Sequence, residues 1–403
     1  MDILFFDKEE ARAHLYPLLL SRPAANLRVG ALRLDEKWSQ LLQGRPSYLT
    51  VNWLASSYGL HTDLQDRALI IFGAVCPDPV LVTRVKELEL GEILVDVNNR
   101  PIAAHTSSSN WEEWGVEAIN HLKAVVYPKS ITRITYPEDI WLNNFQQFLF
   151  DFEHFLRFVS KDENAMQNVR ISGEYEVIVE KGAHLEPCYI DATDGPVFIS
   201  KGSKIQLGSM IKGGVFIGEN VRVKMGAQIY PNCCIGPNCV VAGELANVVF
   251  WGDSNKGHHG YLGCSVIGQY CNLGAGTTNS NLQNNFKAIT VYDYYESGLR
   301  FSGQLKCGVV MGDYSMSGIN TSFTTGAVIG MGVQYASSKI SPKWVADFSW
   351  VTELKNETYK LNKFLETCER RYQMAHAELP LAEREVIINI YKKIIEQSEF
   401  NRQ

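Results

Sequence analysis

Residues 199–246 decide the fold, because they divide into eight groups of six: ISKGSK, IQLGSM, IKGGVF, IGENVR, VKMGAQ, IYPNCC, IGPNCV and VAGELA. Each group opens on Ile or Val. The fourth residue is Gly or Asn in seven of the eight groups, and these residue types adopt positive φ at low cost. The fifth residue is mostly small. A helix does not repeat at six, so the pattern predicts short strands separated by tight turns, three to a coil, stacked as a parallel β-helix.

The six-residue pattern extends to both sides of this stretch. It occurs earlier at Val179 and Gly182, returns at Ile267 and Leu273, and continues over 305–332. We therefore expect a β-helix domain over residues 166–342. Interruptions are expected near residues 246–264 and 284–303, and insertions in a repeat array form loops on one face, often the working face.

The region before the solenoid, residues 1–165, is predicted to be an α/β domain of Rossmann-like type. Apolar runs alternate with helical stretches, which favours a parallel sheet covered by helices. Strands are expected at 3–6, 68–72, 92–95 and 124–127, and helices at 79–90 and 111–122. A further helix, from 137 to 159, is expected to connect this domain to the solenoid.

The region after the solenoid, residues 343–403, is predicted to be a helical extension with helices over 353–374 and 380–397. The second helix places apolar residues on one stripe, at Ile387, Ile388, Tyr391, Ile394 and Ile395. The end of a solenoid is an exposed sheet edge. We therefore expect these helices to cap that end or to pack on a neighbouring subunit.

Composition narrows the classes of function. The chain has 403 residues, a net charge of −6 and no basic run, so neither a nucleic-acid nor a membrane partner is expected. No apolar stretch has the length of a membrane span, and the first residues lack the features of a secretory signal. The nine cysteines include no CxxC pair, which favours buried free thiols in a reducing compartment. The prediction is a cytoplasmic protein.

Two histidines stand among glycines in the segment SNKGHHGYLG, residues 254–263. Such a segment is poor core material, and a neutral imidazole can take a proton from an amine or hydroxyl nucleophile near pH 7. On residue chemistry alone, His258 and His259 can equally be a surface pair that hydrogen-bonds its own loop. A metal site would need further ligands at suitable spacing, and the sequence offers none.

The run from HHGYLG at 258 to NLGAGTTNSNLQNNFK, residues 272–287, resembles the acetyltransferase half of the bifunctional N-acetylglucosamine-1-phosphate uridyltransferase/glucosamine-1-phosphate N-acetyltransferase family. That family carries H-L-x-Y-L/V-G-D, then N-x-G-A-G-T-x-x-x-N and a downstream Lys. Aligned on Tyr-Leu-Gly, His258 falls on the catalytic base. The contacts to the amino-sugar phosphate fall on Tyr261, Asn272, Asn281 and Lys287.

This resemblance implies a left-handed β-helix, a homotrimer and acetyl-CoA as acyl donor, bound between neighbouring subunits. The chain departs from the family at two positions. Ala246 stands where the family has a lysine, and Cys264 replaces the aspartate after Tyr-Leu-Gly. These changes put the contacts to the acceptor's phosphate or nucleotide in doubt.

The N-terminal region is similar to sugar-1-phosphate nucleotidyltransferases. YPLLLSRP at 16–23 and LRVG at 27–30 resemble that family's R-P-L-T-x-x-x-P-K-x-L-x-P-V-G. The G-x-G-T-R loop is missing after the first strand, the family lysine is Ala24, and the metal-binding aspartate is Ala74. Nucleotidyl transfer needs a phosphate cradle and Mg²⁺. The cations expected to clamp phosphates, or else to form surface salt bridges, are Arg22, Arg28 and Lys37.

Three functions are compatible with these patterns. In the first, the β-helix is an acyl-CoA-dependent N-acyltransferase acting on an amino-sugar phosphate or nucleotide, and it is fused to a degenerate nucleotidyltransferase domain. In the second, the N-terminal domain is an active glucose-1-phosphate thymidylyltransferase or uridyltransferase that uses Mg²⁺ and a nucleoside triphosphate, and the β-helix trimerises it. The third is a non-catalytic scaffold that binds a sugar nucleotide.

Overall fold

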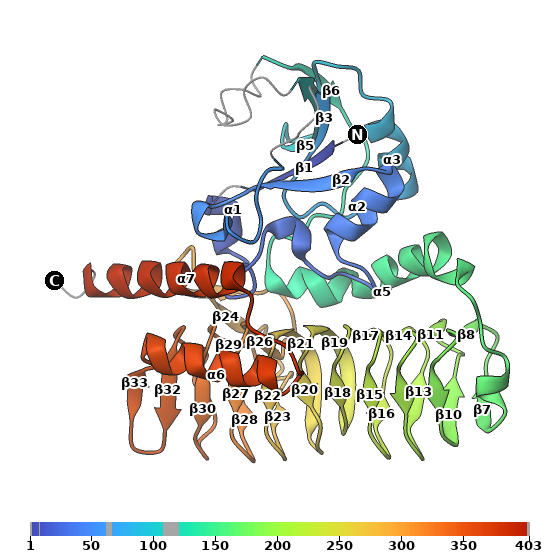
Figure 1. Cartoon of the computed structure of the whole chain (residues 1–403), viewed down its shortest axis with the longest axis vertical. Coiled ribbons are helices and arrows are strands. Elements are labelled where there is room, and N and C mark those ends of the chain that lie inside the picture. The colour runs from blue at the N-terminus through green and yellow to red at the C-terminus, as the bar shows by residue number, and fades with distance from the viewer. Residues whose placement is uncertain (1, 8, 62–66, 108–120, 401–403) are drawn as a thin grey trace.

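The computed structural model describes residues 2–7, 9–61, 67–107 and 121–400. An α/β sheet domain lies against one side of a long β-solenoid, and two C-terminal helices lie beside both parts (Figure 1). The predicted combination of an α/β domain, a parallel β-solenoid and C-terminal helices is confirmed.

The N-terminal sheet has the strand order β2-β1-β3-β5-β4-β6. Its strands are β1 (Asp2–Phe6), β2 (Arg45–Leu49), β3 (Arg67–Phe72), β4 (Glu92–Val95), β5 (Pro101–Ser107) and β6 (Lys123–Val126). The four predicted strands are present, but the prediction of a purely parallel sheet is wrong. Strand β5 runs antiparallel to β3 and β4. Residues 96–100 are too few for a parallel crossover, which takes roughly a dozen residues, so β4 and β5 form a hairpin.

Helices of this domain pack on both the sheet and the solenoid. They include α1 (Glu9–Ala13), α2 (Leu34–Leu42) and α3 (Pro79–Lys86), which begins where Asp78 accepts hydrogen bonds from two backbone amides of its first turn. The helix predicted over 111–122 falls almost wholly outside the described residues. The connecting helix is α5 (Pro137–His154), and its Phe148 and Phe152 pack on Phe198 and Phe216 of the solenoid.

The solenoid has three walls of parallel strands. The first wall, which faces α5 and the N-terminal domain, contains β8 (Val177–Val179), β11 (Val197–Ile199), β14 (Val215–Ile217), β17 (Cys233–Ile235), the second halves of β19 (Glu244–Gly252) and β21 (Tyr261–Gln269), β26 (Val309–Met311), β29 (Ala327–Ile329) and β31 (Trp344–Val345).

The second wall contains β9 (His184–Leu185), β12 (Lys204–Ile205), β15 (Arg222–Val223), β18 (Val240–Val241), β20 (Asn255–Lys256), β22 (Asn272–Leu273), β27 (Met316–Ser317), β30 (Gln334–Ala336) and β32 (Ser349–Thr352). The third wall contains β7 (Val169–Ser172), β10 (Cys188–Asp191), β13 (Met210–Lys212), β16 (Gln228–Ile229), the first halves of β19 and β21, β23 (Thr278–Asn279) and β28 (Ser322–Phe323).

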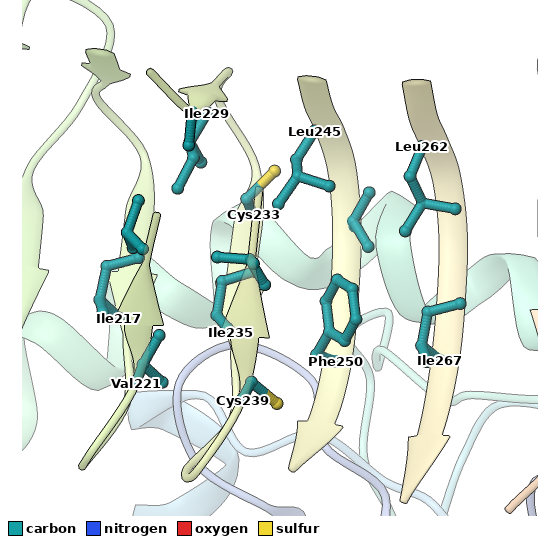
Figure 2. Packing of buried hydrophobic residues seen from close by; sticks show 14 of the residues in the cluster. Ile217, Val221, Ile229, Cys233, Ile235, Cys239, Leu245, Phe250, Leu262 and Ile267 are labelled. Atoms are coloured by element: carbon teal, nitrogen blue, oxygen red, sulfur yellow. The ribbon is translucent and has the colours of Figure 1, made fainter. Parts of the chain in front are cut away.

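The predicted turn and core positions behave as the repeat requires. Seven turn residues have positive φ: Gly202, Gly208, Gly214, Asn220, Gly226, Asn232 and Asn238. The Ile and Val that open each group point inward with the small fifth residues and are buried (Figure 2). Successive coils pair in register, as Ile199 with Ile217 and Ile217 with Ile235. The interior is therefore a stack of aligned apolar columns.

The first predicted interruption, near 246–264, is not an insertion. Leu245 pairs with Ile229, Phe250 with Ile235 and Lys256 with Val241, so the coil continues without a break. Here the spacing between inward residues falls below six, which hides the repeat in the sequence. The second predicted interruption is confirmed, because the segment between β23 and β26 contains an antiparallel hairpin of β24 (Thr290–Asp293) and β25 (Gly298–Phe301).

The C-terminal region closes the solenoid differently from the prediction. Strand β33 (Asn356–Thr358) pairs antiparallel with β32, so α6 (Leu361–Gln373) begins later than the predicted position 353. The open edge of β32 offers backbone partners to the chain that follows it. Helix α7 (Leu381–Phe400) then buries Ile387 in one cluster with Phe348 of the solenoid and Leu20 of the N-terminal domain. The hairpin caps the end, and the helices join the two domains.

Two further sequence expectations concern thiols and membranes. All nine cysteines are buried and free. Among the described residues, no helix combines the length and the apolar character needed to cross a bilayer.

The stability of the solenoid is expected to depend strongly on the size of the side chains that point into its core. Ile217 is fully buried in the core of the solenoid. We expect Ile217→Ala to lower the free energy of unfolding by about 2–5 kcal/mol, because truncation leaves a cavity. The half-exposed Ile171 of the third wall provides the matched control, for which the same truncation should cost about 1 kcal/mol or less. Urea denaturation measures both, and equal losses would contradict the assigned core.

Candidate functional site

A column of glycines hollows the corner between the second and third walls. Gly226, Gly243 and Gly260 occupy equivalent places in three successive coils, all with positive φ. A Cβ at Gly243 would lie 2.6 Å from Gly260 O, and a Cβ at Gly260 would lie 2.1 Å from Thr277 O. Side chains are therefore excluded at Gly243 and Gly260. The result is a depression of about 240 Å³, which we call the corner depression.

The side chains that line the corner depression come from the third wall and from the turn before β21. They belong to Gln228, Glu244, His259 and Tyr261. Glu244 and Tyr261 are register partners in β19 and β21 and follow Gln228 of β16 along the wall. Neighbouring strands lie about 4.8 Å apart, so these side chains form a continuous polar strip.

Tyr261 and Asn281, which the family resemblance predicts to contact the acceptor, are hydrogen-bonded to each other in the structure. Asn281 Nδ2 donates to the Tyr261 hydroxyl at 2.9 Å and also reaches Cys264 Sγ at 3.6 Å. Burial raises the pKa of Tyr261 to about 12, so the hydroxyl stays protonated at neutral pH. Because the phenolic oxygen accepts the bond from Asn281, its own proton can be donated to another group.

Both histidines have exposed side chains on the turn between β20 and β21. This turn is an ordinary corner of the solenoid and not the insertion that the sequence suggested. His259 lines the corner depression, and His258 precedes it on the same turn. The imidazole of His258 is therefore not sealed in apolar packing.

The backbone of the histidine turn is held at four successive carbonyl oxygens, those of residues 257–260. Their donors are, in order, Lys224 Nζ, Lys256 Nζ, Gly276 N and Glu244 N, at 2.9, 2.9, 3.2 and 3.2 Å. Lys256 is the unusual member, because its side chain occupies an inward column and is only 1% exposed. Burial lowers its pKa to about 8.

The other two predicted acceptor contacts lie on different parts of the solenoid. Asn272 is half-buried on the second wall, beside Asn255 of the preceding coil. Lys287 is exposed in the insertion after Asn281. One chain thus presents Tyr261 and Asn281 as a contacting pair, and Asn272 and Lys287 as separate groups.

The three predicted phosphate clamps are buried and bonded to protein groups. Arg22 pairs with Asp313 and stacks over Trp251, with 4.3 Å from its guanidinium carbon to the ring centroid. Arg28 donates to Trp251 O at 3.1 Å. These two residues hold the N-terminal domain on the first wall. The salt bridge of Arg22 is buried where the sequence suggested a surface one, and a phosphate-binding role for these residues stays a prediction.

Lys37 has the same structural character. Its ammonium lies 2.9 Å from Asp151 of α5 and also donates to Val29 O and to Gln147. Burial raises the pKa of Asp151 to about 6, although Lys37 opposes that shift. Both side chains are fully buried, so Lys37 does not face solvent.

A second cavity, of about 410 Å³, opens where the parallel strands β1 and β3 end, and we call it the sheet-edge pocket. In open α/β sheets this edge is the usual place for a ligand. Its basic lining residues are Arg12, His14, Arg100 and Arg133. Arg12 is paired with Asp7 and Arg100 with Asp96, and Arg133 donates to Phe72 O and Pro101 O. The Nε atoms of Arg12 and Arg133 are both buried without a hydrogen-bond partner. Burial lowers the pKa of Arg133.

The sheet-edge pocket contacts the solenoid insertion through His14. His14 Nδ1 lies 2.9 Å from Asp293 Oδ2, and Asp293 also pairs with Arg300 at 3.0 Å. Arg300 in turn pairs with Glu138 at the start of α5. The hairpin β24–β25 is thereby fixed to the N-terminal domain.

Sequence reasoning missed the residues whose partners are distant along the chain. Gln228 and Glu244 lack any local motif, although stacking the glycines at 226, 243 and 260 would have indicated the hollow between them. Arg133 was missed because only the strand order places it beside the end of β3. In the described part of the chain, His, Cys, Asp and Glu do not form a group of three or more suited to a metal ion.

The fold and these two cavities define the class of protein. It is a two-part chain in which an α/β domain with a ligand-sized pocket at its sheet edge is fixed to a hexapeptide-repeat solenoid with a polar corner depression. Residues 3–157 match the family described as sugar nucleotidyl transferase. Residues 214–243 match the bacterial transferase hexapeptide family. The chain therefore combines a sugar nucleotidyl transferase domain with a hexapeptide-repeat domain.

Similar proteins are matched over limited lengths. The bifunctional protein GlmU of Methanocaldococcus jannaschii is 37% identical over 73 residues, which is 18% of this chain and 17% of GlmU. The chain is thus a distant relative of GlmU over part of its length. The polySia-specific acetyltransferase NeuO has a TM-score of 0.30 at 13% identity, covering 47% of this chain and 83% of NeuO.

Another solved structure is a mutant of AntD, an N-acyltransferase from Bacillus cereus in complex with dTDP and coenzyme A. Its TM-score is 0.18 at 12% identity, covering 53% of this chain and 99% of that one. Neither structural likeness is strong enough to carry information on function.

The buried Lys256 predicts an unusual dependence of stability on pH. Burial lowers the pKa from 10.5 to about 8, so between these values the unfolded chain binds the proton and the native protein does not. The cost of burying the charge is therefore present below pH 8 and disappears as the pH rises to 10.5. We expect Lys256→Met to be more stable than the parent by about 1–3 kcal/mol near pH 7.

Urea denaturation at several pH values measures this difference. The advantage of Lys256→Met should shrink steadily between pH 8 and 10.5. Leu273→Met, in the adjacent buried position of the same column, controls for packing and should give a difference that does not change with pH. A constant advantage of Lys256→Met across the range would contradict the lowered pKa.

Proposed function

We propose that the solenoid transfers an acyl group from an acyl-CoA, with acetyl-CoA as the donor, to the amine of an amino sugar that carries a phosphate or nucleotide. His258 is the general base. The observation that carries this proposal is the exposure of His258 on a rigid turn, one residue before the lining of a polar depression that also contains Tyr261. The resemblance in 258–287 supplies the reaction, and the geometry is consistent with it.

The chemistry of the lining supports an amine acceptor. Glu244 offers a carboxylate, which attracts an ammonium group and orients the amine that remains after deprotonation. Tyr261 and Asn281 offer hydroxyl and amide groups suited to sugar hydroxyls. In the reaction the amine nitrogen attacks the thioester carbonyl, the amide forms, and the thiolate of coenzyme A leaves and is protonated. The base removes the proton that the nitrogen loses.

The proposed assembly is a homotrimer that completes the site. The third wall presents large apolar side chains to solvent beside the corner depression, namely Tyr189, Met210 and Tyr230. Exposed apolar groups in this density are typical of a protein interface. In a trimer, Asn272 and Lys287 of different chains can approach a common ligand.

The test of the acyltransferase proposal is a pair of histidine variants. His258→Ala should lower kcat by about 10²–10⁴-fold, because a general base contributes that much. Activity is measured as coenzyme A release and acylated product, with acetyl-CoA and a panel that contains glucosamine-1-phosphate and nucleotide-linked amino sugars. His184→Ala, another exposed histidine of the solenoid, is the matched control and should keep the parental rate.

His259→Ala distinguishes the two imidazoles of the turn. A modest effect, mainly on KM, is expected for a residue that lines the depression. Parental kcat in His258→Ala would remove His258 from the mechanism, and a loss confined to His259→Ala would transfer the role of base to His259.

The sheet-edge pocket supports a second function, ligand binding by the N-terminal domain, because several of its lining residues are cationic. We propose that this pocket binds a nucleotide or sugar nucleotide through Arg133 and Arg100, and that the domain is degenerate in catalysis because Ala74 lies where β3 ends. A carboxylate at that position would be needed to hold the Mg²⁺ that offsets the charge of the transferring phosphate. The alternatives of an active Mg²⁺-dependent nucleotidyltransferase and of a scaffold without catalysis are outcomes of the same experiment.

Ligand-dependent stability tests the sheet-edge pocket. Uridine and thymidine nucleotides should raise the thermal midpoint, by the equivalent of about 2.7 kcal/mol at a hundredfold excess over Kd. Arg133→Met should weaken binding by about 10–100-fold through loss of a charged hydrogen bond. Arg84→Met, on the exposed face of α3, should leave binding unchanged. Release of pyrophosphate from a nucleoside triphosphate, a sugar-1-phosphate and Mg²⁺ would overturn the assignment of a degenerate domain.

A further inference from the structure

The buried Lys256 occupies an inward column of the second wall whose members in the neighbouring coils are apolar, although Ser317 stands in the same column further along. Its column contains Val223, Val241 and Leu273 in neighbouring coils, all buried. An apolar residue would pack there without the cost of removing an ammonium group from water. A residue that breaks the pattern of its own column in this way is a candidate for a functional role.

The contacts of Lys256 point to what that role is. Its amino group leaves the core toward the histidine turn and donates to His258 O at 2.9 Å. A Cβ placed on Gly260 would lie only 3.2 Å from this nitrogen, so the glycine leaves room for it. The lysine thus connects the interior of the solenoid to the peptide that links the two histidines.

We propose that Lys256 is a positioning residue for the general base, holding the peptide between His258 and His259 so that the imidazole of His258 faces the acceptor amine. This inference rests on the proposed acyltransferase function. Lys224 holds the adjacent Gly257 carbonyl from outside the coil, but Lys256 anchors the turn from within. A donor whose side chain is packed in the core constrains the peptide more closely than a surface side chain does.

Loss of the Lys256 donor would affect catalysis by changing the orientation of the His258 imidazole. Displacing a reacting group by about 1 Å can cost about a hundredfold in rate. Without the ammonium donor, the turn keeps its other carbonyl bonds but the His258–His259 peptide is free to rotate. The imidazole of His258 then samples orientations that do not face the acceptor amine.

The experiment uses Lys256→Met in the full-length protein, with Leu273→Met as control for placing a methionine in the same column. Lys256→Met should lower kcat about 10–100-fold while KM for acetyl-CoA stays within about twofold. The thermal midpoint should equal or exceed that of the parent. Leu273→Met should keep parental kcat. A merely structural lysine would instead lose stability and activity together, and that result would overturn the proposal, as would parental kcat in Lys256→Met.

Amide hydrogen exchange gives a readout that does not depend on activity. Exchange in the peptides covering residues 257–262 should accelerate in Lys256→Met and remain parental in Leu273→Met. Unchanged exchange in Lys256→Met would overturn the positioning role. If the parental protein acylates none of the amino sugars, the acyltransferase proposal fails by itself, and accelerated exchange would still support Lys256 as the anchor of the turn.

Discussion

The structure depends on one backbone constraint, which is that the chain must turn a corner after each short strand, and at most corners it does so through a residue with positive φ. Glycine and asparagine meet it along the first coils, from Gly202 to Asn238. Because the corners stack, the inward residues of successive coils align, and the apolar columns follow from the turns. The same constraint produces the corner depression, since Gly226, Gly243 and Gly260 leave a strip of bare backbone between two walls. The candidate site is therefore a direct product of the turn chemistry.

The N-terminal domain is attached to this solenoid through buried charges as well as apolar contacts. Arg22 pairs with Asp313 across the contact, and within the domain Lys37 of α2 pairs with Asp151 of α5, the helix that packs on the solenoid; both pairs are out of water. A buried pair is weak evidence for added stability, but loss of one partner leaves an uncompensated charge. Such pairs specify how two surfaces meet. Together with the contact of His14 with Asp293, they fix the sheet-edge pocket and the solenoid insertion in one arrangement.

The sequence predicts the solenoid well where the period is constant and fails where it changes. From Ile199 to Val241 every inward position is correct, because six residues per strand and turn leave no freedom of register. At Leu245 and Phe250 the spacing shortens, and the continuing coil was taken for an insertion.

In the N-terminal domain, the strands were predictable from apolar runs, whereas the direction of β5 follows from the length of a single loop. Tyr261 and Asn281 meet because they lie on adjacent coils, which the repeat implies. The burial of Arg22 and Lys37 could not be predicted, since Asp313 and Asp151 are remote in sequence and no local pattern pairs them.

The charges around the corner depression bear on how an acceptor would be oriented in the proposed reaction. Its lining includes the carboxylate of Glu244 and no lysine or arginine, and Ala246 removes a cation that the resembling family has nearby. A phosphate placed here would meet a carboxylate at close range, which is unfavourable in a partly desolvated site. The amine end of the acceptor therefore suits the depression, and its anionic end suits the exposed Lys287 on the insertion. The hairpin that continues this insertion is held by Asp293 and Arg300 against the N-terminal domain, so in the proposed reaction the contact between the two domains would set the position of the anionic end.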